Sequence, residues 1–252
     1  MREPVFEPAK TPMQRGVYLL PNLLTTLALF AGFYSIVAAM NYRMETAAIA
    51  IFVAMIADSL DGRVARLTNT QSAFGAQYDS LSDLIAFGLA PSLIMLHWSL
   101  VHLGKLGWAV AFFYTAATAL RLARFNTQVT DKAYFQGLPC PSAAGLMASF
   151  IWIGSQYELD GVSVAPFACV LTFVVAILMV SLIRYNSFKE LDTKGRVPFV
   201  TAIAVVLTIV CIALEPPIVL FILFGIYIAS GPIMTLIKLR QVKKQRFLKP
   251  RN

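Results

Sequence analysis

Charged residues are scarce in this 252-residue chain, at 13% of the total against about 25% in typical soluble domains. Hydrophobic residues make up 58%, and the mean hydropathy is +0.70. This composition excludes a soluble globular protein and indicates a protein embedded in a lipid bilayer. Since membrane helices and short loops would use the whole length, we expect a single domain over residues 1–252.

Cysteine and histidine are also scarce. The three cysteines, Cys140, Cys169 and Cys211, show no CxxC spacing, which argues against a disulfide framework and against a zinc site. His97 and His102 fall at one end of an apolar run and are assigned no chemistry. Any chemistry must therefore come from the few charged side chains on or between membrane helices, where each charge is costly.

Apolar runs of about the length that crosses a bilayer recur along the chain. They lie at about Val17–Met40, Thr46–Leu67, Asp79–Leu100, Gly107–Arg124, Pro141–Gln156, Val162–Ile183, Val197–Leu214 and Ile218–Leu239. The fifth run is the shortest, but its small residues have a spacing that lets helix backbones approach closely. We predict an all-α integral membrane protein with a bundle of about eight transmembrane helices.

Basic residues are distributed unevenly between the two sides that eight crossings would create. Every Lys and Arg except Arg43 and Lys105 falls on the side of the two termini. Because positive residues favour the cytoplasm, we predict that both termini are cytoplasmic, including segment 1–16 and the basic tail 240–252. The tail either signals topology alone or also lies against the anionic inner leaflet. The net charge of +8 thus indicates orientation, and no nucleic-acid partner is expected.

Four aspartates gather at one end of the second and third runs. Asp58 and Asp61 are three residues apart, and Asp79 and Asp83 are four apart, so each pair projects from one helix face. The short connection makes the two helices antiparallel neighbours, which should bring the pairs together. Carboxylates so close repel one another unless a cation neutralises them. Oxygen ligands without His or Cys favour Mg²⁺ or Mn²⁺, with Ca²⁺ also suitable, and four carboxylates suffice for two divalent cations that act on a diphosphate.

Small and basic residues flank these aspartates. Gly62, Ala65 and Gly75 would let phosphates and a nucleotide approach the helix backbone, and Arg66 can bind a phosphate with two parallel hydrogen bonds. Two alternatives remain open from the residues alone. The aspartates could form buried ion pairs with nearby arginines, or line an ion pathway in a transporter.

The whole segment resembles, at every fixed position, the signature of the CDP-alcohol phosphotransferase family: Asp58-x2-Asp61-Gly62-x2-Ala65-Arg66-x8-Gly75-x3-Asp79-x3-Asp83. The resemblance implies transfer of a phosphatidyl or similar group from a CDP-linked donor to an alcohol, with release of CMP. It also implies that the four aspartates hold two metal ions and that Asp83 takes the proton from the attacking hydroxyl. Residues implied to accommodate the CDP moiety are Asp61, Gly62, Ala65, Arg66 and Gly75.

Further segments resemble the bacterial members of this family that use serine as acceptor: Pro21–Thr25, Ala119–Asn126, Phe135–Gly145 and Ser187–Lys189. This resemblance implies CDP-diacylglycerol and L-serine as substrates and a homodimer in a bacterial inner membrane. The distribution of basic residues predicts that the site faces the cytoplasm, because the aspartates lie at the cytoplasmic ends of the second and third runs. Other acceptors, such as glycerol 3-phosphate or inositol phosphate, remain alternatives within the family.

Several polar residues in these segments are candidates for substrate binding. Asn22 and Thr25 could hydrogen-bond the donor's base or ribose, although Asn22 could instead cap the first helix. Arg121 and Arg124 share a helix face and could bind the carboxylate of serine, or could serve only as membrane anchors. Asn126 and Ser142 are expected at the same level in the membrane as these arginines, and we predict that they also contact the serine acceptor.

Overall fold

The computed structural model describes residues 12–127, 135–185 and 199–248, and nearly all of them are helical. Segments 1–11 and 249–252, at the two ends of the chain, and the resembling segment Ser187–Lys189 lie outside the described residues. The elements are α1 (Pro12–Met40), α2 (Met44–Leu67), α3 (Ala73–Asp83), a π-helical segment (Leu84–Leu89), α4 (Ala90–Trp98), a 3-10 turn (Leu100–Leu103), α5 (Lys105–Thr127), β1 (Phe135–Gln136), α6 (Cys140–Gln156), α7 (Gly161–Val180), β2 (Arg184–Tyr185), α8 (Phe199–Leu214) and α9 (Pro216–Leu248).

Five described helical stretches are long and apolar enough to cross a bilayer: Leu20–Met40, Ala73–Trp98, Lys105–Thr127, Gly161–Val180 and Pro216–Ile237. The protein is therefore a helical, multi-pass membrane protein, as the composition predicts. The helix α2 is not among the five because its last turns carry aspartates and arginines. The helix α6 has 17 residues, and the apolar part of α8 is also short. The prediction of eight crossings thus depends on these three helices and stays a prediction.

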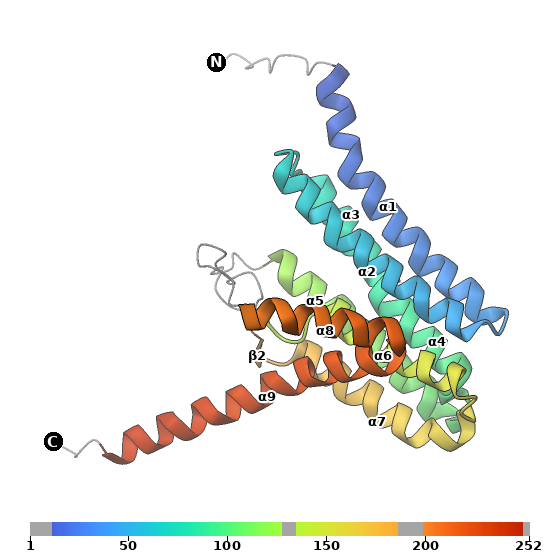
Figure 1. Ribbon diagram of the computed structural model, residues 1–252, viewed down its shortest axis with the longest axis vertical. Coiled ribbons are helices and arrows are strands. Elements are labelled where there is room, and N and C mark those ends of the chain that lie inside the picture. The colour runs from blue at the N-terminus through green and yellow to red at the C-terminus, as the bar shows by residue number, and fades with distance from the viewer. Residues whose placement is uncertain (1–11, 128–134, 186–198, 249–252) are drawn as a thin grey trace, which may run out of the picture.

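In Figure 1 the helices α1, α2 and α3 run together from upper left to lower right, whereas α9 runs toward the lower left in a different direction. The α1 and α2 helices pack side by side, α6 lies between α2 and α9, and α5 packs on α7. In Figure 1 the α2–α3 turn, the end of α5 and the end of α9 lie on the left, and the α1–α2 and α8–α9 turns lie on the right. We call the end of the bundle that contains the α2–α3 turn the carboxylate end.

Small residues allow α1, α2 and the π-helical segment to approach closely. The buried face of α2 consists mostly of alanines, among them Ala47, Ala54 and Ala57. Gly32 of α1 faces the π-helical segment so closely that an added Cβ would lie 2.6 Å from the Cα of Ala86. Such close packing gains many dispersion contacts, which drive helix association where lipid is as apolar as the side chains.

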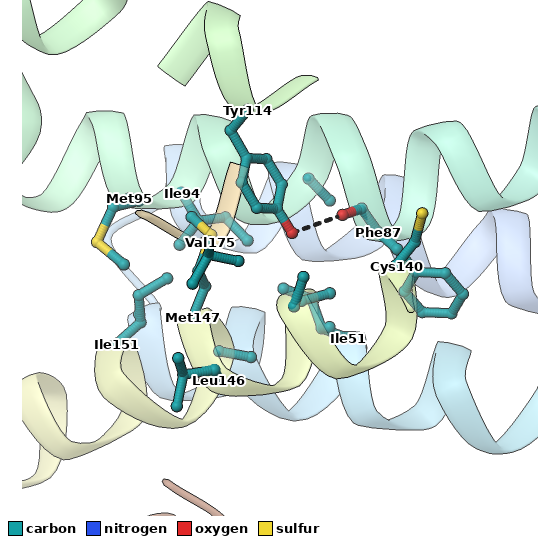
Figure 2. Close-up of a cluster of buried hydrophobic side chains, with 14 of the residues drawn as sticks. Ile51, Phe87, Ile94, Met95, Tyr114, Cys140, Leu146, Met147, Ile151 and Val175 are labelled. Atoms are coloured by element: carbon teal, nitrogen blue, oxygen red, sulfur yellow. Dashed lines mark hydrogen bonds between the residues drawn. The ribbon is translucent and has the colours of Figure 1, made fainter. Parts of the chain in front are cut away.

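The third apolar run is not one regular helix, contrary to the simple span predicted over 79–100. A π-helical segment begins at Leu84, directly after Asp83. Pro91 has no N–H and so cannot donate to the carbonyl of Phe87, four residues earlier. The buried hydroxyl of Tyr114 in α5 donates to that carbonyl instead, at 3.0 Å, within the apolar cluster in Figure 2. A side chain of the neighbouring helix α5 therefore supplies a hydrogen-bond donor to the irregular turn.

The same substitution of donors occurs in α9. Pro232 lies inside the helix, and the carbonyl four residues earlier belongs to Ile228. The buried Tyr185 hydroxyl, from β2, donates to this carbonyl at 3.2 Å. The ring of Tyr185 also packs against Gly231, where any side chain would collide with it. A tyrosine from another element thus supplies the donor that each of these two prolines removes.

A short antiparallel ladder, which the sequence analysis did not predict, joins Phe135–Gln136 to Arg184–Tyr185. Gly137 follows it with a positive φ of 79°, and its N–H donates to the carbonyl of Ile183 at 2.8 Å. Glycine suits this position because a side chain would collide with the carbonyl of Met179 and because the left-handed conformation is strained for other residues. The ladder holds the start of α6 against the end of α7.

We predict that Tyr114→Phe lowers the free energy of unfolding by about 1–2 kcal/mol, because a buried carbonyl loses its donor. Denaturant unfolding of the purified protein in detergent measures this change. The exposed Tyr157 offers a matched control, and Tyr157→Phe should have no effect. In a Pro91→Ala background the restored N–H can replace the hydroxyl, so Tyr114→Phe should cost less there. An equal cost in both backgrounds would contradict this account of the π-helical segment.

Candidate metal centre

The two aspartate pairs predicted from the sequence meet at the carboxylate end. One carboxylate oxygen from each of Asp58, Asp61 and Asp79 lies within 4.8 Å of the other two. Asp83, one turn beyond Asp79, reaches the carboxylate of Asp58 within hydrogen-bonding distance and interacts electrostatically with the remaining two. Asp61 is buried and the other three are half-buried. Four carboxylates in so little water repel one another strongly.

These residues fit a divalent cation. One oxygen of Asp79, Oδ1, is buried without a hydrogen-bond partner, which is costly for a carboxylate. A hard cation would satisfy this oxygen and offset the repulsion, and a donor set of carboxylate oxygens suits Mg²⁺, Mn²⁺ or Ca²⁺. The structure thus provides a candidate metal centre between α2 and α3.

Local sequence explains why α3 begins where it does. Ser72 precedes the helix in extended conformation, and its hydroxyl accepts a hydrogen bond from the N–H of Gly75 at 3.0 Å. This N-terminal cap places the next turns of α3 so that Asp79 and Asp83 face α2. The predicted small residue Gly75 therefore also contributes to the cap, and its Cα faces Asn22, whose Oδ1 would lie 3.5 Å from an added Cβ.

The predicted donor-binding residues surround the aspartates on α1, α2 and α3. Beside Gly62 an added Cβ would meet nothing within 4 Å, so open space adjoins the helix there. Arg66 is exposed and its Nε donates to the carbonyl of Gly62 at 2.9 Å. Ala65 is half-buried between them. Thr25 differs from the others because it is only 4% exposed and its hydroxyl donates to Asp61 at 2.6 Å.

The predicted acceptor residues are not all together. Arg121 is half-buried; its Nη1 donates to the Cys140 thiol at 3.0 Å, and its Nε is buried without a hydrogen-bond partner. Arg124 is exposed, and its Nη1 donates to the carbonyl of Val180 at 3.5 Å. Asn126 is also exposed and donates to Ser80 at 3.0 Å. Arg121 thus contacts Cys140, whereas Asn126 contacts Ser80, the sequence neighbour of Asp79.

Ser142 lies half-buried in the first turn of α6. Two residues earlier, Cys140 is fully buried and interacts electrostatically with both Asp83 and Arg121. The sequence analysis argued only against a disulfide or a zinc site at this cysteine. The resemblance of segment Phe135–Gly145 to other family members was the one sequence feature that could have indicated that Cys140 lies near the site.

Comparison with known proteins agrees with the geometry. A sequence model of the CDP-alcohol phosphatidyltransferase family matches residues 18–165, which include most of α1, all of α2 to α6 and all four aspartates. The chain belongs to this family, as the signature in the sequence implied. The match ends in α7, before α8 and α9.

Relatives with similar sequences include three with informative names. A Helicobacter pylori protein named CDP-diacylglycerol–serine O-phosphatidyltransferase is 44% identical over 58% of this chain and 62% of its own length. A Mycobacterium tuberculosis protein of the same name is 37% identical over 57% of this chain and 53% of its own. An archaetidylserine synthase from Methanothermobacter thermautotrophicus is 35% identical over 64% of this chain and 66% of its own. The chain thus spans less than two thirds of these relatives.

We predict that the purified protein binds Mn²⁺ without any substrate and that Asp79→Asn weakens this binding at least about tenfold. Even the loss of a group that only orients a metal ligand commonly costs about 10- to 100-fold in affinity. Electron paramagnetic resonance of free Mn²⁺ measures the change.

Asp160 provides the matched control for this experiment. It caps α7 at the opposite end of the bundle, where hydrogen bonds from Val162 and Ser163 lower the pKa of its carboxyl. Asp160→Asn should leave Mn²⁺ binding unchanged. Equal binding by Asp79→Asn and the unchanged protein would refute the metal centre.

Proposed function

We propose that this chain transfers the phosphatidyl group of CDP-diacylglycerol to the hydroxyl of L-serine, giving phosphatidylserine and CMP. The observation that carries the proposal is the meeting of Asp58, Asp61, Asp79 and Asp83 between α2 and α3, in a chain of this family. The names of the relatives support serine as the acceptor.

The reaction forms a bond between the serine hydroxyl oxygen and the β-phosphorus of the donor. The bond from that phosphorus to the oxygen that leaves with CMP breaks, and Asp83 accepts the hydroxyl proton. The four aspartates would hold two divalent cations, Mg²⁺ or Mn²⁺ with Ca²⁺ as an alternative, whose charge neutralises the diphosphate. The position of Asp83 beside Asp58, deepest along α3, supports its role as the base.

On the donor side, we propose that Asn22, Asp61, Gly62, Ala65, Arg66 and Gly75 form the site for the CDP moiety. Thr25, the remaining residue predicted for this site, is buried against Asp61 instead. The open space beside Gly62 supports this assignment, because a nucleotide could approach the backbone there. Arg66 is exposed next to that space and can contact a phosphate. Asn22 and Gly75 lie together and would bound the same site from α1 and α3.

On the acceptor side, we propose that Arg121 binds the carboxylate of serine, with Arg124, Asn126 and Ser142 around it. The unpartnered, buried Nε of Arg121 supports this, since a buried guanidinium donor calls for an acceptor. A thiol is a weak, neutral acceptor, so the bond to Cys140 leaves the positive charge of Arg121 available.

We further propose that residues 1–252 form one domain with eight crossings, both termini in the cytoplasm, and the carboxylate end facing the cytoplasm of a bacterial inner membrane. The distribution of basic residues supports this orientation. A homodimer is proposed from the family resemblance.

We predict that Gln71→Cys, in the α2–α3 turn, resists labelling by an impermeant thiol reagent in intact cells. The substitution is made in a variant that lacks the three native cysteines. Labelling there would contradict the orientation.

We predict that the purified protein with Mn²⁺ or Mg²⁺ releases CMP from CDP-diacylglycerol when serine is present, and that a chelator abolishes the release. Glycerol 3-phosphate and inositol phosphate are the competing acceptors, and each should be offered in turn with the lipid product identified by mass spectrometry. Preference for a phosphorylated acceptor would reject serine. Absence of CMP release with every acceptor would favour the alternative of a transporter.

Replacement of Arg121 should affect serine and not the donor. Arg121→Lys loses the planar guanidinium contact, which is worth about 1.5–3 kcal/mol, so the KM for serine should rise roughly 10- to 100-fold. The KM for CDP-diacylglycerol should change little. Arg124→Lys, at the exposed neighbouring turn, should raise the KM for serine less. Unchanged serine kinetics in Arg121→Lys would reject the proposed carboxylate site and leave the reaction itself standing.

A further inference from the structure

Thr25 joins three helices at the level of the aspartates. Its hydroxyl oxygen lies 2.6 Å from Oδ2 of Asp61 in α2 and 3.1 Å from the carbonyl of Pro21 in its own helix. A hydroxyl has one proton, and the shorter bond to a charged acceptor is the stronger one. The carbonyl of Thr25 in turn accepts a hydrogen bond from Ser82 in α3 at 3.1 Å.

The burial of Thr25 argues against a direct contact with the nucleotide. Its exposed fraction is 4%, and that of its partner Asp61 is 5%. Asp61 has the smallest exposed fraction of the four aspartates, and a buried carboxylate needs a donor to fix its orientation. Ser82 is also buried and adjoins Asp83 in sequence. The hydrogen bonds of Thr25 therefore lie inside the helix bundle, next to the aspartates.

We propose that Thr25 is a positioning residue for the metal centre: its hydroxyl holds the carboxylate of Asp61 so that one oxygen is directed to Asp58 and Asp79. The effect of Thr25 on catalysis rests on the proposed function, whereas its effect on metal binding does not. Without the hydroxyl, repulsion from the other carboxylates would turn Asp61 away. The affinity for a divalent cation would then fall, while the surface that meets the donor would stay as it is.

The test compares Thr25→Val, Thr25→Ala and Thr25→Ser by Mn²⁺ binding to the purified protein without substrates. Thr25→Val keeps the shape of the side chain and removes the hydroxyl, so the affinity for Mn²⁺ should fall about tenfold. Thr25→Ala should behave likewise. Thr25→Ser keeps the hydroxyl and should stay within about twofold of the unchanged protein.

Ser35 provides a matched control within the same pair of helices. Its buried hydroxyl donates from α1 to the carbonyl of Ala47 in α2 at 2.6 Å, near the opposite end of the bundle. Ser35→Ala removes an α1–α2 hydrogen bond of similar length and burial, so it should lower thermal stability to a similar extent. It should leave the affinity for Mn²⁺ unchanged.

Two results would overturn the proposal. Unchanged Mn²⁺ affinity in Thr25→Val together with a raised KM for CDP-diacylglycerol would show that Thr25 contacts the donor directly. An equal loss of affinity in Thr25→Val, Thr25→Ser and Ser35→Ala would show a loss of packing only. Failure of the proposed function is separate from both, because the Mn²⁺ measurement uses no substrate. A protein whose Mn²⁺ binding depends on Thr25 but which makes no phosphatidylserine would refute only the function.

Discussion

Mutual repulsion among the four aspartates is the constraint on which the arrangement around them depends. Helices that carry such charges would separate unless other contacts held them together at the same level. Alanines on the buried face of α2 and Gly32 of α1 allow a close approach, and dispersion contacts then accumulate along the pair. Metal binding would release this repulsion, so the site is assembled by packing and completed by a cation.

Hydrogen bonds from α1 to α2 and α3 add to the packing around the aspartates. Thr25 links α1 to both α2 and α3, and the adjacent Thr26 lies 2.9 Å from the hydroxyl of Tyr78 in α3. In a membrane each of these bonds is worth a modest amount, on the order of 1 kcal/mol. The bond from Thr25 matters mainly because it fixes the orientation of the buried Asp61 carboxylate.

Proline positions show how the bundle tolerates irregular backbone. Pro91 and Pro232 each remove a donor from a helix, and Tyr114 and Tyr185 each provide a replacement from elsewhere in the chain. The π-helical segment that precedes Pro91 begins directly after Asp83, so the irregular backbone adjoins the proposed base. Such segments are frequent at functional sites, where they turn a side chain away from the regular helical direction.

The sequence by itself determined the membrane class, the positions of most helices and the four aspartates. Composition and helical spacing act locally, and a fixed motif identifies its family without a structure. Tertiary structure alone decided that Cys140 approaches both Arg121 and Asp83, whereas Arg124 and Asn126, on the same helix as Arg121, stay exposed. It also decided the hydrogen bond between Thr25 and Asp61, which are 36 residues apart. These contacts depend on how helices rotate against one another, and close packing sets that rotation through small residues distributed over the whole chain.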